Sequence, residues 1–344
     1  MEAIKPIKLI STRTNKTKMD EKLTSAEVGK LWATYIGNSM AKCVLSYFLQ
    51  NIEDQEIKKT VEYALFLSEQ MVQTIKEILN KENHPVPVGF TEDDVNLGAP
   101  RLFSDEFYLH YLKYAAKAGM SIYAIAVPLM SRHDVRTFFT NCLEVTIKLI
   151  NQVNDVLIIK GSFVKAPYIP IPKKIEIVKK QSYLNGFLGH VRPLHALEIT
   201  HLYDNIQNNV TSKSLLIGFR QVTKLDEVRE FLHRGEKITS NHIETWSQLL
   251  EDEGLQSHPA LDHLVTNSSF SPFSDKLMVF HKVDMFSMKI RSYGNSLAVD
   301  GRHDIAAKYA GFLLDVGRFA EDGAKLMINH EWMEQPPHAS GRDA

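Results

Sequence analysis

Apolar residues recur along this chain at spacings of three and four, the period of an amphipathic helix. One such set lies between residues 139 and 157: Phe139, Leu143, Ile147, Ile150, Val153 and Leu157. An earlier set has the same spacing: Ile57, Val61, Ala64, Met71, Ile75 and Ile78. Each set lies on one face of a helix and predicts a stripe that faces a core. Long period-two patterns, typical of strands, are absent from the sequence, so the pattern predicts an all-α fold.

The chain contains an internal repeat whose two copies are separated by about half of its 344 residues. After a one-residue gap the offset changes from 171 to 170, and the order of the matches is kept. The aligned identities include Asn38 with Asn209, Glu56 with Glu227, FSD at 103–105 with FSD at 273–275, and RHD at 132–134 with RHD at 302–304. The chain is therefore predicted to hold two homologous domains.

Each repeat predicts four helices, with a long connection between the second and the third. Helix starts are indicated by three capping-box patterns: Thr24 with Glu27, Ser131 with Asp134, and Thr223 with Asp226. The connections, near 83–103 and 254–273, are much longer than antiparallel neighbours need. A crossover that runs the length of the bundle explains them, as in ferritin-like topologies. We therefore predict two tandem four-helix bundles, each up-down-down-up.

Proline and charge mark the expected boundaries of these domains. The predicted segments are a basic flexible tail at 1–20, a first bundle at 21–164, a proline-rich linker at 165–191, a second bundle at 192–334 and a flexible tail at 335–344. Pro167, Pro170 and Pro172 exclude regular helix from the linker.

Composition excludes several classes of protein. The chain has 40 Lys and Arg against 41 Asp and Glu, which argues against a nucleic-acid partner. Two cysteines, Cys43 and Cys142, cannot form a disulfide scaffold, and their helical positions predict small buried side chains. The apolar run 122–130 is too short to span a bilayer, and residues 1–20 lack an apolar leader segment. These features predict a cytoplasmic protein without a membrane span.

Catalytic motifs are not found in the sequence. It has no phosphate-binding glycine loop, no GxSxG, no CxxC and no HExxH. A di-iron centre in a four-helix bundle needs carboxylates from all four helices and two Glu-x-x-His pairs. Glu198 and His201 form such a pair in the second repeat, but the first repeat has none. The sequence therefore favours a protein that is not an enzyme.

Histidines gather in the second repeat, where eleven of the 14 lie from His190 onward. Counting helical turns places Glu198, His201 and His242 at one end of the second bundle, so a single metal ion or a small polar ligand is one hypothesis for this end. The alternative is structural: Glu198 aligns with Glu27 and caps a helix, and the histidines are satisfied core residues. Asn38 and Asn209 are interpreted as equivalent buried polar groups that fix register.

Four stretches carry a family resemblance: LTSAEVGKLWATYIGNSM at 23–40, PVGFTEDDVNLGAPRLFSDEFYLHYLKY at 87–114, RPLHALEITHLYDNIQNNV at 192–210 and PFSDKLMVFHK at 272–282. They resemble a bacillar family of tandem domains of unknown function. The resemblance implies two ferritin-like four-helix bundles in a protein of spore-forming bacteria, with a spore coat label on some relatives. It implies no activity, substrate or site residue.

Three functions are weighed on these grounds. The first is a non-enzymatic structural or interaction protein, spore- or stress-associated, with a protein partner or a second copy of itself. The second is a protein that binds one metal ion or a small ligand in the second bundle through Glu198, His201 and His242. The third, a ferritin-like metal-dependent oxidoreductase, is disfavoured by the scarcity of Glu-x-x-His pairs. We favour the first.

Overall fold

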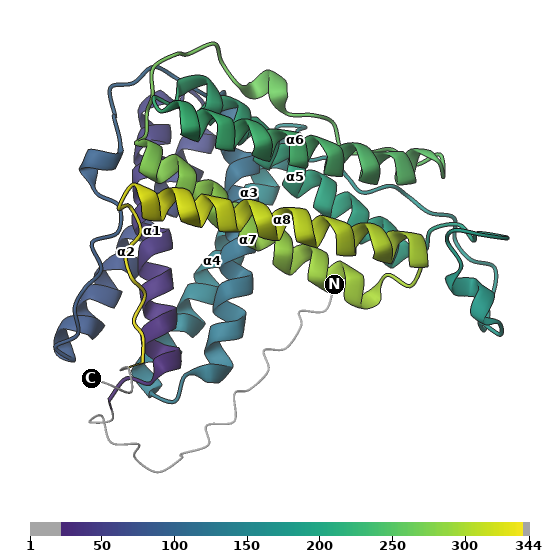
Figure 1. Cartoon of the computed structure of the whole chain (residues 1–344), viewed down its shortest axis with the longest axis horizontal. Coiled ribbons are helices and arrows are strands. Elements are labelled where there is room, and N and C mark those ends of the chain that lie inside the picture. Colours follow the sequence, from purple (N-terminus) through teal and green to yellow (C-terminus); the bar gives the residue numbers. More distant parts are fainter. Residues whose placement is uncertain (1–21, 340–344) are drawn as a thin grey trace.

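The computed structural model describes residues 22–339, which fold into long helices (Figure 1). The long helices are α1 Ser25–Asn51, α2 Gln55–Lys81, α3 Asp105–Ala126, α4 His133–Ile159, α5 Ala196–Val222, α6 Asp226–Glu251, α7 Asp275–Val299 and α8 His303–Asn329. Short 3-10 turns are η1 Glu92–Asp94, η2 Val127–Leu129, η3 Gln181–Leu184 and η4 Asp262–Leu264. Residues 22–339 contain isolated β-bridges but no strand, so the predicted all-α class is confirmed.

Each repeat is a four-helix bundle with the predicted chain direction. At one end of the first bundle, the Asp105 carboxylate at the start of α3 accepts the amides of Glu53 and Asp54, at 3.0 and 2.7 Å, just before α2 begins. At the other end, Glu27 near the start of α1 accepts the amide of Arg132, at 2.8 Å, just before α4 begins. Helices α2 and α3 therefore start at the same end, which confirms the crossover and the up-down-down-up order.

Capping boxes begin the first helix of each repeat. Thr24 and Glu27 form the predicted box on α1, with the Thr24 amide 2.8 Å from the Glu27 carboxylate. On α5 the aligned residues His195 and Glu198 form the same box, and the His195 ring nitrogen accepts the Glu198 amide at 3.2 Å. The helix starts that recur in sequence are thus built by the same reciprocal bonds.

Two other predicted capping boxes are wrong. Helix α4 has Arg132 as its N-cap, and the Ser131 hydroxyl instead donates to the Glu27 carboxylate at 3.0 Å. Similarly, the Thr223 hydroxyl donates to Asp275 at 2.7 Å rather than capping α6. In both places a carboxylate from a neighbouring helix competes for the hydroxyl, and sequence spacing within one helix does not show this.

The stripe predicted on α2 is buried except for the half-buried Ile78, but the stripe on α4 is only partly correct. Ile147 is 43% exposed. The buried positions of α4 are Val135, Phe138, Phe139, Cys142, Thr146, Leu149, Val153, Val156 and Leu157. The core-facing side carries Cys142 and Thr146, which are not strongly hydrophobic. A stripe chosen by hydrophobicity alone therefore included positions that lie nearer the surface.

The two crossovers pair with each other, a feature that the sequence did not predict. Isolated antiparallel bridges join Val95 to Phe273 and Phe103 to Val265. Four backbone hydrogen bonds connect the segments: Asn96 N to Pro272 O at 2.8 Å, Thr266 N to Leu102 O at 3.0 Å, Ser104 N to Leu264 O at 2.9 Å, and Ser274 N to Asp94 O at 3.0 Å. Each bond has a counterpart at aligned positions in the other repeat, so an internal two-fold relates the repeats.

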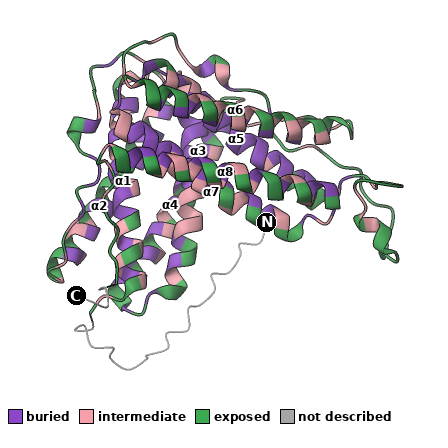
Figure 2. Ribbon diagram, viewed as in Figure 1, coloured by how far each residue is buried: buried purple, intermediate pink, exposed green. Residues whose placement is uncertain are grey.

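The bundles cross at a steep angle and share one apolar interior (Figure 1). Buried residues run continuously through the region where they meet (Figure 2). On this contact the Tyr111 hydroxyl lies 2.8 Å from His281 Nε2, and Tyr114 donates to the carbonyl of Met285 at 2.7 Å. The two repeats therefore form one packed body.

The predicted tail at 1–20 lies outside the described residues, as do residues 340–344 of the predicted C-terminal tail. No helix that the structure describes has the length and apolar character needed to cross a membrane.

Candidate functional site at the end of the second bundle

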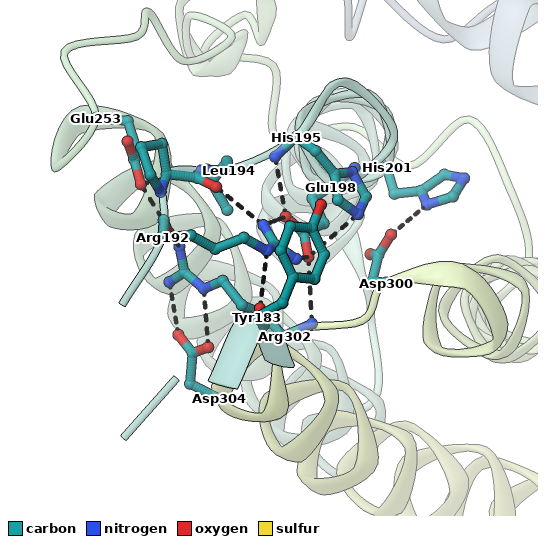
Figure 3. Close-up of polar contacts among 11 residues, drawn as sticks. Tyr183, Arg192, Leu194, His195, Glu198, His201, Glu253, Asp300, Arg302 and Asp304 are labelled. Atoms are coloured by element: carbon teal, nitrogen blue, oxygen red, sulfur yellow. Dashed lines mark hydrogen bonds and ion pairs between the residues drawn. The ribbon is translucent and has the colours of Figure 1, made fainter. Parts of the chain in front are cut away.

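Glu198, the first of the three predicted site residues, is fully buried in the first turn of α5. Its two oxygens accept both terminal nitrogens of Arg192, each at 2.7 Å (Figure 3). They also accept the amides of His195 at 3.0 Å and Arg302 at 3.2 Å. The carboxylate is therefore engaged by four donors that join the starts of α5 and α8.

Arg302 extends this cluster toward the end of α6. Its guanidinium pairs with Asp304 at 3.0 and 2.8 Å, reaches Glu253 at 3.5 Å and donates to the carbonyl of Arg192 at 3.2 Å. The first repeat has an aligned set with the same geometry: Glu27 to the Arg132 amide at 2.8 Å, Arg132 to Asp134 at 2.7 Å, and Arg132 to Glu82 at 2.8 Å. Because the cluster recurs in both repeats, we interpret it as structural. We call the set Arg192, Glu198, Glu253, Arg302 and Asp304, which joins the helix ends of the second bundle, the lock.

The lock favours charged carboxylates. Burial raises the pKa of Glu198, but the ion pair with Arg192 and the His195 amide outweigh it, and the net shift is downward. In Asp304 burial is likewise outweighed by the hydrogen bonds and charge of Arg302, so its pKa is lowered. Both side chains are thus held as anions by the guanidinium groups beside them.

His201, the second predicted residue, pairs with Asp300 rather than with Glu198. Its Nδ1 lies 2.8 Å from Asp300 Oδ1, and Figure 3 shows its ring turned away from Glu198. Burial raises the pKa of Asp300, and the other oxygen of this carboxylate has no hydrogen-bond partner among the described residues. The aligned residues of the first repeat are Lys30 and Met130, so this pair belongs to the second bundle alone.

His242, the third predicted residue, lies in the aromatic core of the second bundle. Its Nδ1 is 3.0 Å from the Tyr293 hydroxyl, and its ring stacks on Phe312 with 3.7 Å between centroids. Burial lowers the pKa of His242 to about 2, so the ring is neutral in the folded protein. Its Nε2 has no hydrogen-bond partner in the described part of the chain.

The structure thus places Glu198, His201 and His242 in three separate sets of contacts. Within the described part of the chain, no three His, Cys, Asp or Glu side chains form a group that could hold a metal ion. His303, the first residue of α8, is exposed. The single metal ion stays a prediction, which elemental analysis of protein purified without a His tag would test.

The polar residues noted in the helical runs have equivalent partners. Asn209 donates to Tyr293 at 2.8 Å, and Asn38 donates to the aligned Tyr123 at 3.3 Å. Both cysteines are buried and free, as expected, and burial raises the pKa of each thiol.

Two buried lysines in α7 escaped the sequence analysis. Lys282 is fully buried, with its ammonium 2.9 Å from the Ser212 hydroxyl, and Lys289 donates to a threonine hydroxyl at 2.8 Å. Burial lowers the pKa of both well below that of a free lysine. The repeat could have indicated them, because it aligns Lys282 with Leu112 and Lys289 with Gly119, two residues typical of a helix interior or a close contact.

A family model, described as a protein of unknown function, DUF3231, matches residues 11–175 and again residues 182–344. The chain belongs to the DUF3231 family. Two consecutive matches in this DUF3231 chain agree with the duplication found in the sequence and in the fold.

Among solved structures, the DUF3231 chain is similar to a "putative spore coat protein" from Bacillus halodurans. The two are 18% identical, and the similarity covers 44% of this chain and 98% of that chain with a TM-score of 0.40. No curated protein matches the DUF3231 chain.

Proposed function

We propose that this protein is a non-enzymatic helical-bundle protein with a structural or interaction role, and that it binds a second copy of itself through the linker between its bundles. The observation that carries the proposal is the exposed apolar surface of this linker. The lock residues Glu198 and Arg302 contribute to the fold, so the linker is the more informative surface for function.

The linker between α4 and α5 exposes several large apolar side chains. The most exposed are Tyr168 at 81%, Ile171 at 92%, Ile175 at 94%, Ile177 at 74%, Phe187 at 67% and Leu188 at 83%. The backbone of residues 166–179 forms no hydrogen bond with the rest of 22–339. A sequence of exposed apolar residues on an unpaired extended backbone is typical of a segment that docks on another protein.

Charge favours a second copy of the chain as the partner. Residues 165–191 contain five lysines and one glutamate, a net charge of +4. Because the whole chain carries −1, the remaining residues carry −5. The linker of one copy therefore complements the acidic remainder of another, and salt is expected to weaken the contact.

Size-exclusion chromatography with light scattering tests this proposal. We expect the full chain to self-associate at micromolar concentration and low salt. The triple variant Ile171→Ser, Ile175→Ser and Ile177→Ser should be monomeric. A matched control changes three exposed apolar residues on helices, Ile158, Ile159 and Leu314, to serine and should associate like the natural chain. A natural chain that is monomeric at all concentrations, or a linker variant that still associates, contradicts the proposal.

A spore-associated setting is the second element of the proposal. It rests on the sequence resemblance to families with a spore coat label. Immunoblotting of fractions from sporulating cells tests it, with enrichment in the coat fraction as the expected result. Recovery only in the mother-cell or forespore soluble fraction contradicts it, independently of the oligomeric state.

A further inference from the structure

The first bundle encloses a cavity of about 420 Å³. Its lining comes from α1, α2, α3 and α4, and also from α7 of the second repeat. Since α7 lies outside the first bundle, the cavity reaches from the first bundle to its contact with the second. Its volume falls within the range of small-molecule sites, roughly 300–1,000 Å³.

The cavity exists because the first repeat has small side chains where the second has large ones. Ala116 aligns with Phe286, and Gly119 aligns with the buried Lys289. In the second bundle the Lys289 ammonium lies 3.9 Å from the centroid of the Phe286 ring. Both side chains are buried in the second bundle, whereas Ala116 and Gly119 are among the residues that line the cavity in the first.

Three residues that line this cavity carry buried polar atoms without a hydrogen-bond partner among the described residues. The Thr34 hydroxyl, on a side chain only 4% exposed, has no hydrogen-bond partner among the described residues. The same holds for Nδ1 of His281, a residue that is 3% exposed, and for Nε of Arg291. Buried donors and acceptors without partners cost stability, so a ligand with a polar group would offset that cost.

The charged residues at the cavity favour an anion. Arg291 and Lys30 both line it, and the Arg291 guanidinium donates to the sulfur of Met288 at 3.8 Å. Asp284 is the one acidic residue of this lining against these two basic ones; burial raises the pKa of its carboxyl, while the charge of Arg291 lowers it. The balance of permanent charge at the cavity is therefore positive.

We propose that the first bundle is a binding site for an anionic amphiphile, a carboxylate with a single apolar chain. The apolar chain lies between the helices, against Ala116 and Gly119. The carboxylate lies near Arg291 and Lys30, which supply the charge-assisted contacts. One ligand binds per chain, because side chains fill the aligned positions of the second bundle.

Gly37 offers a way to close the site without disturbing the fold. It lies in α1 and lines the cavity, and a Cβ added there would meet no atom within 4 Å. Leucine is also a better helix former than glycine. Gly29 is the matched control, because it lies in the same helix, has open space around it and does not line the cavity.

Isothermal titration calorimetry of the full chain with dodecanoate, below its micellar concentration, tests the site. We expect saturable binding of one dodecanoate per chain. Gly37→Leu should weaken binding by at least about tenfold, and Gly29→Leu should change it by less than about twofold. Ala116→Phe, which places the residue of the second repeat in the first, should also abolish binding if circular dichroism shows it folded.

The head group is tested with dodecanol and dodecylammonium in place of dodecanoate. Arg291→Gln should weaken dodecanoate binding by about tenfold and leave dodecanol binding unchanged. The site is overturned if dodecanoate does not saturate, or if it binds Gly37→Leu as tightly as the natural chain. The assignment to anions is overturned if dodecylammonium binds more tightly than dodecanoate. None of these outcomes depends on self-association through the linker.

Discussion

A buried histidine without a charged partner makes a folded protein sensitive to acid. His242 is fully buried, contacts Tyr293 and Phe312, and has its pKa lowered by burial to about 2 from an ordinary value of 6.5. Below pH 6.5 the unfolded chain takes up a proton at this residue and the folded chain does not. The free energy of unfolding therefore falls as the pH falls through this window.

Replacing His242 with the residue of the first repeat should remove this sensitivity. Met71 aligns with His242, so His242→Met introduces a side chain that the same fold already accommodates. Between pH 7 and pH 5 the natural chain should lose about 2 kcal/mol more unfolding free energy than the variant. Urea titrations at the two pH values measure the difference. The control is His303→Met at an exposed position, which should keep the natural pH dependence. Equal losses of unfolding free energy in the natural chain and in His242→Met would contradict the account.

At the scale of the helix, the buried carboxylates Glu27 and Glu198 lie at equivalent positions at the starts of α1 and α5, but they have different side-chain partners. Both accept two backbone amides, but Glu27 adds hydroxyl groups, whereas Glu198 adds the Arg192 guanidinium. Removing one member of a buried ion pair leaves the other charge without a partner, which costs more than the loss of a neutral bond. The second repeat should therefore depend more strongly on its cap than the first.

Matched glutamine variants test this difference. Glu198→Gln should lower the free energy of unfolding at pH 7 by about 3 kcal/mol, and Glu27→Gln by about 1 kcal/mol. Because the pKa of Glu198 is lowered in the fold, its contribution is present above pH 4.5 and is lost as the pH falls below that value. Chemical denaturation at pH 7 and pH 4 measures both effects. Equal costs for the two variants would show that Arg192 adds nothing.

Sequence was a good guide to the elements whose signals are local. The helical period gave the all-α class, the repeat gave two bundles, and the crossovers followed from their length. The aligned Glu27 and Glu198 indicated a cap. The failures concern contacts between elements: Ser131 and Thr223 bond to carboxylates of other helices, and equal height along the bundle did not bring His201 to His242. Spacing along one helix carries no information on which way such side chains turn.

At the scale of the whole molecule, the crossovers bind the two repeats together. Four backbone hydrogen bonds and the Tyr111–His281 contact join residues about 170 positions apart. Neither half can satisfy these groups alone, and separation would expose buried aromatic residues. The sequence predicted two domains with a linker between them but gave no sign of this pairing, because the crossover segments have no strand-like pattern.

Separated halves should therefore fail to fold as stable monomers. Expressed alone, residues 22–164 should show weakened helical circular dichroism and aggregate. Mixing with residues 192–334 should restore a one-to-one complex with the thermal transition of the full chain, apart from the lost linkage. Circular dichroism and light scattering measure both. A monomeric half with a cooperative transition near that of the full chain would contradict this prediction.

The contact between Tyr111 and His281 has a consequence for how such a chain can diverge. In a dimer of two identical subunits, a residue on the symmetry axis faces its own copy and can only form a pair of like groups. Tyr111 and His281 occupy aligned positions, yet they form an unlike pair, hydroxyl to imidazole. Joining both copies in one gene allows each side of the axis to mutate independently. The same independence permits Phe286 in one half and the smaller Ala116 in the other. One bundle can therefore keep a filled core while the other has a cavity.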